Sequence, residues 1–313
     1  MKDGVKISII GAGNVGASAA LMCLMKNLGD EIVLLDIVPG VPQGKAMDLN
    51  QSASVFGLKG KITGTNDYED ISCSDLIVVT AGFPRKEGMT RFDLLKKNAG
   101  IVLDVAENIK KYSPGSFVIL TTNPLDVMSC LFFKKSGFSK NKVIGMAGIL
   151  DTARFIYYLQ KAVKVPREVI STVVLGVHGE NMVPVEEHTK VNEIPLTKIL
   201  SHDEIEKVVF STMQGGAEII KNLKTSAYVA PAAAVVRMIE AILRDKNEVL
   251  PCSVYLGGEY GYKEIFLGVP VRLGKNGVEE IIKLSLSEEI RKRLDKSVEE
   301  VKNGIKELEQ IIL

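Results

Sequence analysis

Short apolar runs alternate with stretches of helical composition through the first half of the chain. The runs are four to six residues long and rich in Val, Ile and Leu: Val5–Ile10, Glu31–Asp36, Leu76–Thr80, Phe117–Thr121 and Val143–Met146. Such runs are typical of strands that are buried on both faces of a parallel sheet. With helical stretches such as Ala17–Lys26 between them, they predict an α/β fold with a doubly wound parallel sheet.

The pattern changes after about residue 150, where the helical stretches become longer and the strands sparser. Helices are predicted at Leu150–Val163, Glu204–Leu223 and Ala230–Leu243, and strands at Val169–Leu175, Val249–Leu256 and Glu264–Pro270. We therefore expect two domains, a doubly wound Rossmann domain over residues 1–147 and an α+β substrate domain over residues 148–313.

The tail from Ser287 carries apolar residues at a spacing of three and four: Ile290, Leu294, Val298, Val301, Ile305 and Leu308. This spacing predicts an amphipathic surface helix that packs on its own domain, in preference to a coiled coil. Ser285 and Glu288 form a candidate capping box at its start.

Composition and charge argue against several classes of protein. The 313 residues carry 39 basic and 38 acidic side chains, a formal charge of +1, which favours neither a nucleic-acid nor an anionic-membrane partner. A membrane span needs about 18 consecutive apolar residues, and Asn14 and Lys26 interrupt the apolar N-terminal segment. The cysteines are far apart and lack metal-ligand spacing, so we expect reduced, buried thiols in a cytoplasmic protein without a metal site: Cys23, Cys73, Cys130 and Cys252.

A glycine-rich turn follows the first predicted strand and opens a helix. Its sequence, Gly11-Ala12-Gly13-Asn14-Val15-Gly16, matches the dinucleotide-binding pattern GxGxxG in the required context. Gly11 would allow the tight turn, Gly13 the approach of a pyrophosphate, and Gly16 the packing of helix on strand. Asp36, at the end of the second strand, can accept hydrogen bonds from a ribose diol and would repel a 2′-phosphate. The pattern therefore predicts that the chain binds NAD rather than NADP.

His178 is the main candidate for acid–base chemistry among the three histidines. It lies between glycines directly after an apolar strand, and an ordinary histidine pKa near 6.5 suits proton transfer at neutral pH. Asp151 and Arg154 share one helix face. They can form a simple ion pair, or Asp151 can orient a histidine while Arg154 binds a substrate carboxylate. Arg85 and Arg91 lie in a loop after the third predicted strand, where they can be either solvated or functional.

Together, these motifs closely resemble the lactate/malate dehydrogenase family, and within it the malate dehydrogenases of the lactate-dehydrogenase-like branch. The similarity extends over residues 5–310 and includes GAGNVG, PRKEGMTR, LDTARF, VHGENMVP and SAYVAPAAA. It implies a catalytic His178 oriented by Asp151, with Arg91 polarising the substrate carbonyl. The substrate-binding residues that it implies are Arg85, Arg91, Asn123 and Arg154. Beyond the glycine turn and Asp36, the cofactor contacts that it implies are Thr80, Ala81, Gly82, Asn98, Thr121 and Asn123.

The resemblance implies NAD-dependent, reversible oxidation of (S)-malate to oxaloacetate, a reaction of the tricarboxylic acid cycle. It also implies a homo-oligomer, with a tetramer favoured over a dimer. A lactate dehydrogenase on the same scaffold is the nearest alternative. Arg85 argues against it, because a neutral residue would be expected there, and Ala227 stands where the lactate enzymes usually have Thr. A dinucleotide-binding sensor without catalysis would not need His178, Asp151, Arg91 and Arg154 together.

Overall fold

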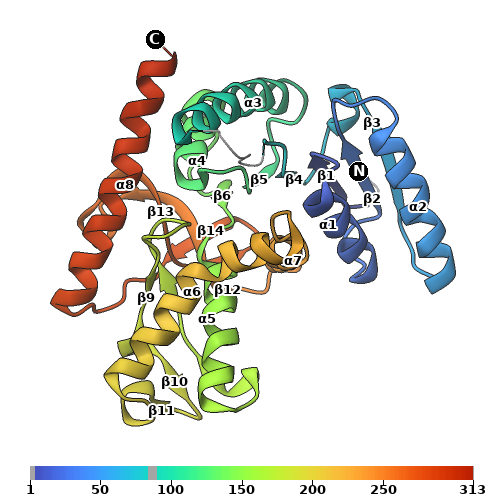
Figure 1. Ribbon diagram of the computed structural model, residues 1–313. Coiled ribbons are helices and arrows are strands. Elements are labelled where there is room, and N and C mark those ends of the chain that lie inside the picture. The colour runs from blue at the N-terminus through green and yellow to red at the C-terminus, as the bar shows by residue number, and fades with distance from the viewer. Residues whose placement is uncertain (1–3, 84–89, 313) are drawn as a thin grey trace.

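The centre of the molecule is one extended sheet (Figure 1). The structure, a computed structural model, describes residues 4–83 and 90–312, apart from the side chains of Arg91, Ile311 and Ile312. Within these residues the sheet has nine strands in the order β14-β13-β12-β6-β5-β4-β1-β2-β3. Strands β1 to β6 run parallel, and their order reverses between β1 and β4, as in doubly wound dinucleotide-binding sheets. The predicted α/β fold is therefore confirmed.

All five apolar runs predicted in the first half form strands. Their central residues, such as Ile7, Ile77 and Val118, are completely buried, as expected for strands covered on both faces. The edge strand β3 was not predicted, because its sequence KITGT has no apolar run. The parallel strands are β1 (Lys6–Ile10), β2 (Glu31–Leu35), β3 (Lys61–Thr65), β4 (Leu76–Val79), β5 (Phe117–Leu120) and β6 (Val143–Gly145).

Helices cover both faces of the sheet. α3 packs beside α4, whereas α1 packs against α7 (Figure 1). The helices are α1 (Asn14–Met25), α2 (Val41–Phe56), α3 (Arg91–Tyr112), α4 (Leu125–Ser136), α5 (Gly148–Val163), α6 (His202–Leu223), α7 (Val229–Leu243) and α8 (Glu288–Ile312). Short 3₁₀ segments are η1 (Tyr68–Ile71), η2 (Arg167–Val169), η3 (Glu186–His188), η4 (Leu196–Lys198) and η5 (Glu259–Gly261).

The second half of the chain adds antiparallel strands to the β6 edge of the parallel sheet. Ser253 of β12 (Glu248–Gly257) pairs with Gly145 of β6, and β13 (Lys263–Gly274) and β14 (Gly277–Ile281) follow. The sheet is therefore continuous across the boundary expected at residues 147 and 148.

The strand predicted at Val169–Leu175 is instead two short strands. β7 (Ile170–Ser171) pairs with β10 (Lys190–Val191), whereas β8 (Val174–Leu175) pairs with β9 (Val183–Pro184). Because the two segments have different partners, they belong to separate small sheets. β11 (Ile194–Pro195) completes the sheet of β7 and β10.

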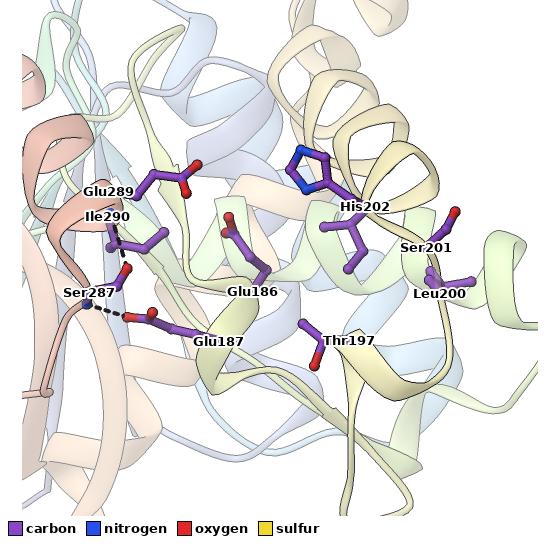
Figure 2. Close-up of a pocket in the computed structure, with 10 residues that line it drawn as sticks. Glu186, Glu187, Thr197, Leu200, Ser201, His202, Ser287, Glu289 and Ile290 are labelled. Atoms are coloured by element: carbon purple, nitrogen blue, oxygen red, sulfur yellow. Dashed lines mark hydrogen bonds between the residues drawn. The ribbon is translucent and has the colours of Figure 1, made fainter.

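The C-terminal helix α8 packs along both halves of the chain. The residues of its predicted apolar stripe are buried, with Ile305 half-buried, and the helix contacts α3, α4 and β13 (Figure 1). The contact with β13 agrees with the predicted packing on its own domain, and the contacts with α3 and α4 extend this packing to the first half. The predicted capping box was wrong, because the Ile290 N–H donates to Ser287 Oγ at 3.3 Å (Figure 2). Ser285 lies before the helix, and its carbonyl oxygen lies 2.7 Å from His188 Nε2.

None of the four cysteines, all of which the structure describes, forms a disulfide, and three of them are buried as predicted. Cys73 is exposed, which corrects the expectation for that residue. Within residues 4–83 and 90–312, no helix has the length and apolar character to cross a membrane.

Candidate active site

The glycine turn after β1 has the geometry that its sequence predicts. Gly11 has a φ of +109°, and a Cβ there would lie 2.6 Å from the backbone nitrogen of Ala81. A Cβ on Gly16 would lie 2.0 Å from the Gly11 carbonyl oxygen, so only glycine lets α1 begin this close to β1. A Cβ on Gly13 would meet nothing within 4 Å. Gly13 is also the exposed N-cap of α1, and no side chain caps this helix, so its first N–H groups are available to a pyrophosphate.

Asp36 follows β2 and faces the glycine turn. Its Oδ2 accepts the Ala12 N–H at 2.8 Å, and its Oδ1 accepts the Val38 N–H at 3.0 Å. These bonds fix the carboxylate, while each oxygen retains a further lone pair that can accept from a ribose hydroxyl. The turn and Asp36 together fit a dinucleotide with an unphosphorylated ribose.

Threonine hydroxyls bind the loops at the carboxyl ends of β1, β4 and β5 to one another. Thr80 Oγ1 donates to the Gly11 carbonyl at 2.8 Å, and Thr121 Oγ1 donates to the Val79 carbonyl at 3.1 Å. Thr122, which was not among the predicted cofactor contacts, donates to the Ala81 carbonyl at 2.6 Å. These loops therefore form one rigid edge beside the point where the strand order reverses.

Asn98 of α3 extends this edge. Its Oδ1 accepts the Phe83 N–H at 2.8 Å, and its Nδ2 donates to the Asn123 carbonyl at 2.7 Å. Asn98 is 1% exposed, so it connects the two loops from inside. A direct contact of Asn98, Gly82 or Asn123 with a cofactor stays a prediction.

His178, Asp151 and Arg154 come together in a single hydrogen-bonded row. Asp151, in the first turn of α5, is 1% exposed. Its Oδ2 lies 2.7 Å from His178 Nδ1, and its Oδ1 accepts from Arg154 Nη1 at 3.1 Å. Asp151 therefore forms the ion pair with Arg154 and orients His178 at the same time. With Nδ1 held by Asp151, His178 can exchange a proton at Nε2.

The charges around His178 favour its protonated form. Burial lowers the pKa of His178, and so does the Arg154 charge, but the charge and hydrogen bond of Asp151 and the charge of Asp126 outweigh them. The resulting pKa lies above 6.5. An imidazole that gains a proton is thus stabilised by neighbouring carboxylates.

Arg154 lies between α5 and α6. Its Nη2 is 3.6 Å from the position that a Cβ on Gly216 would occupy, and Tyr158, one turn along, packs on Gly215. This glycine pair was not predicted from the sequence. Two adjacent glycines inside a helix destabilise it by roughly 0.5–1 kcal/mol each relative to alanine, which is a signal that another group approaches closely. Because one guanidinium N–H is used by Asp151, others can still bind a carboxylate.

Asp126 of α4 is a second buried carboxylate that the sequence analysis missed. It is 1% exposed, its Oδ2 accepts the His178 backbone N–H at 3.0 Å, and its Oδ1 accepts from Ser253 Oγ at 2.6 Å. Burial raises the pKa of Asp126 to about 6, against the two hydrogen bonds and the His178 charge, which lower it. Its place three residues after Asn123 was the one available signal.

Two predicted substrate residues cannot be located. Arg85 lies outside the described residues, and Arg91 begins α3 but its side chain also lies outside them. Thr90 caps this helix, because its hydroxyl accepts the Asp93 N–H at 3.0 Å. The roles of Arg85 and Arg91 stay predictions.

A separate cavity of about 330 Å³ lies between η3, the start of α6 and the start of α8 (Figure 2). Its lining includes Glu186, Glu187, His202 and Glu289 and none of the predicted site residues that the structure describes. Within residues 4–83 and 90–312, no group of three or more His, Cys, Asp or Glu side chains is arranged to hold a metal ion.

Comparison with known proteins agrees with this arrangement. The model of the lactate/malate dehydrogenase NAD binding domain matches residues 5–145, and that of the lactate/malate dehydrogenase alpha/beta C-terminal domain matches residues 149–312. The malate dehydrogenase of Pelodictyon phaeoclathratiforme is 48% identical over 309 residues, which cover 98% of this chain and 100% of that protein.

Two solved structures from Cryptosporidium parvum are similar over almost the whole chain. Its malate dehydrogenase has a TM-score of 0.95 and 45% identity, covering 98% of this chain and 99% of that one. Its lactate dehydrogenase, complexed with lactic acid and NAD, has a TM-score of 0.95 and 44% identity, covering 99% of each chain. The chain therefore belongs to the lactate/malate dehydrogenase family.

Proposed function

We propose that this chain catalyses the NAD-dependent, reversible oxidation of (S)-malate to oxaloacetate. The observation that carries the proposal is the row of His178, Asp151 and Arg154, with distances of 2.7 and 3.1 Å. It combines a histidine with a raised pKa and a guanidinium with free donors, which are the groups that a 2-hydroxy acid requires. A sensor without catalysis gives no reason to assemble this row beside a dinucleotide site.

The chain's own residues have distinct roles in the proposed mechanism. His178 accepts the hydroxyl proton of malate at Nε2, and Asp151 holds the imidazole tautomer and stabilises the imidazolium. Arg154 binds the C1 carboxylate through its remaining N–H groups. Arg91 would polarise the C2 oxygen, a role worth about 3–4 kcal/mol by analogy with oxyanion donors.

The glycine turn, Asp36 and the edge from Thr80 to Asn123 would hold NAD. When bound, NAD supplies the hydride acceptor. Asp36 would select it over NADP, because its carboxylate repels a 2′-phosphate.

The choice between malate and lactate would rest on Arg85. The fold does not distinguish them, since the malate and lactate enzymes of one organism are 45% and 44% identical to this chain. Oxaloacetate has a second carboxylate that can pair with a guanidinium, and pyruvate has none.

The test is the loss of NADH absorbance with oxaloacetate and with pyruvate, under the same conditions. We expect kcat/KM to be higher for oxaloacetate by about 10²–10⁴, as for a site that loses a charge partner. A preference for pyruvate would assign the chain to lactate oxidation, and inactivity with both would reject the proposal.

We further propose a homo-oligomer, with a tetramer favoured over a dimer. Large apolar side chains are exposed on α2, including Val55 at 84% and Phe56 at 63%, and on α6, where Phe210 is 65% exposed. Apolar faces of this kind support contacts between copies of a chain. Light scattering after size exclusion gives the mass, and Phe56→Ser with Phe210→Ser should reduce it. A wild-type monomer would reject this proposal.

We likewise propose that residues 1–147 form the domain that binds the cofactor and residues 148–313 the domain that binds the substrate. We propose a cytoplasmic location, which the buried cysteines Cys23, Cys130 and Cys252 support, because thiols outside disulfides suit a reducing compartment. Fractionation of cells would test that location.

A further inference from the structure

The turn that carries His178 is held by three successive backbone N–H groups. Gly176 donates to the Gly268 carbonyl of β13 at 2.8 Å, Val177 to Ser297 Oγ of α8 at 2.6 Å, and His178 to Asp126 Oδ2 of α4 at 3.0 Å. Each acceptor comes from a different element. Gly176 has a φ of +86°, and a Cβ there would lie 2.5 Å from Ser297 Oγ, so only glycine fits at this point of the turn beside α8.

Asp126 differs from the other two acceptors because it is an acid. A carbonyl and a hydroxyl suffice for Gly176 and Val177, and a neutral acceptor would equally satisfy the His178 N–H. Burying a carboxylate costs free energy that a neutral group does not. Both oxygens of Asp126 accept hydrogen bonds, from the His178 N–H at 3.0 Å and from Ser253 Oγ at 2.6 Å, and these bonds favour the ionised carboxylate although burial raises its pKa. The cost of burying this charge must therefore be offset by an effect that a neutral hydrogen-bond acceptor could not provide.

The reason lies in the electrostatics of His178. The described charged groups that face it are Asp151 and Arg154 on α5 and Asp126 on α4. The Arg154 charge opposes protonation of the imidazole, and the two carboxylates favour it. The facing groups from β12 and α8 are the neutral hydroxyls of Ser253 and Ser297. Farther along α8, Glu300 accepts from Asn181 Nδ2 at 2.7 Å.

We propose that Asp126 is a positioning residue for His178, which it acts on in two ways. It holds the backbone of the turn through the His178 N–H, and its negative charge stabilises the imidazolium form of His178 beside the Arg154 guanidinium. Asp126 also follows Asn123 by three residues, and the Asn123 carbonyl accepts from Asn98. Residues 123–126 therefore connect Asn98, at the predicted cofactor edge, with the turn that carries His178. The catalytic consequence rests on the proposed function, whereas the effect on the imidazole does not.

The decisive comparison is Asp126→Asn against Ser297→Ala. In Asp126→Asn, the amide oxygen can still accept the His178 N–H, and the amide NH₂ can donate to the Ser253 hydroxyl. The variant thus removes the charge and keeps the shape. Ser297→Ala removes a neutral support of the same turn at Val177.

The first measurement is an NMR titration of the imidazole signals in the enzyme without cofactor. The chain has three histidines, so His178 can be assigned with His178→Asn, and His188 and His202 serve as internal references. We expect the pKa of His178 to fall in Asp126→Asn and to stay unchanged in Ser297→Ala. An unchanged pKa in Asp126→Asn, or an equal fall in both variants, would overturn the proposal.

The second measurement is the pH profile of oxaloacetate reduction, which needs protonated His178. In Asp126→Asn the alkaline limb should move to lower pH, with kcat/KM about 10- to 100-fold lower on that limb, because each unit by which the imidazole pKa falls removes about a factor of ten of the protonated form. Ser297→Ala should lower the rate without moving the limb. If Asp126→Asn does not fold, Ser253→Ala removes one bond that keeps Asp126 ionised, and it should move the limb the same way. If the alkaline limb does not move in Asp126→Asn, or in Ser253→Ala where Asp126→Asn does not fold, the proposal is overturned.

These outcomes separate the two levels of inference. A wild-type enzyme that is inactive with both keto acids rejects the proposed function, while the NMR titration still decides the role of Asp126. An active wild type with an unaltered His178 pKa in Asp126→Asn rejects only the role of Asp126.

Discussion

Replacing Asp151 with Asn tests the central pair of the site, because this carboxylate contacts both His178 and Arg154. The 2.7 Å contact with His178 Nδ1 is a charge-assisted hydrogen bond when the imidazole is protonated. Such a bond contributes about 1.5–3 kcal/mol, and each 1.4 kcal/mol is a factor of ten, so its loss alone predicts a fall of about 10- to 100-fold in kcat. An Asn that donates to Nδ1 would also oppose protonation of Nδ1 and hence the imidazolium that reduces oxaloacetate, so the total loss should approach about 10²–10⁴.

The assay is steady-state reduction of oxaloacetate over a range of pH, with NADH binding followed separately by fluorescence. Because Asp151 raises the pKa of His178, its replacement should move the alkaline limb to lower pH. Arg154→Gln is the matched control, since Arg154 lowers the pKa of His178 and its loss should move the limb to higher pH. It should also raise KM for both keto acids. A loss below tenfold in Asp151→Asn, or shifts in the same direction for both variants, would refute this account.

Four further variants test other parts of the molecule. His178→Asn should lower kcat by at least about 10²–10⁴ and leave NADH binding almost intact in a fluorescence titration; activity within tenfold of wild type would contradict the assignment. Asp36→Ala should reduce the preference for NADH over NADPH in kcat/KM, and equal use of both by the wild type would contradict the role of Asp36. Arg85→Gln should lower the oxaloacetate-to-pyruvate ratio of kcat/KM by about 10²–10⁴, whereas an unchanged ratio would favour lactate as substrate. Glu240 is buried and binds Lys26 at 2.8 Å, and its ion pairs lower its pKa from 4.5 to about 2. Glu240→Gln should therefore reduce the free energy of unfolding at neutral pH by about 1–2 kcal/mol, and urea denaturation should show the difference shrinking as pH falls below about 4.5.

The buried strands of the first half could be predicted because each is a continuous apolar run, whereas β3 could not. Its sequence mixes Lys61, Thr63 and Thr65 with Ile62 and Gly64. Gly64 is required by tertiary packing, since a Cβ there would lie 2.2 Å from the Pro42 carbonyl oxygen of α2. That contact joins residues whose proximity no local pattern reveals. Ser287 was likewise missed as a cap, because its position is fixed by Glu187, which accepts its N–H at 2.9 Å from a distant part of the chain.

The same reasoning explains which site residues could be predicted. Gly11, Gly16 and Asp36 lie within one strand–helix–strand unit, so their spacing was enough to predict the geometry of the turn. Asp126 is separated from His178 by 52 residues and from Ser253 by 127, and Ser297 is separated from Val177 by 120. Nothing in the local sequence marks Asp126, Ser253 or Ser297 as neighbours of His178. Only the order of the strands in the sheet brings them to one turn.

The junction between β6 and β12 bears directly on how such a site can work. In the proposed mechanism, cofactor binding depends on loops of the first half, whereas His178 and Arg154 belong to the second half. Hydride and proton transfer to one substrate require these groups to keep their relative positions, and a misplacement of about 1 Å can cost a factor of about 10². Ser253 pairs with Gly145 across this junction and donates to Asp126, which in turn binds His178. The buried carboxylate thus lies where the two halves join, and a movement between them would have to break its hydrogen bonds before it could separate the imidazole from the cofactor edge.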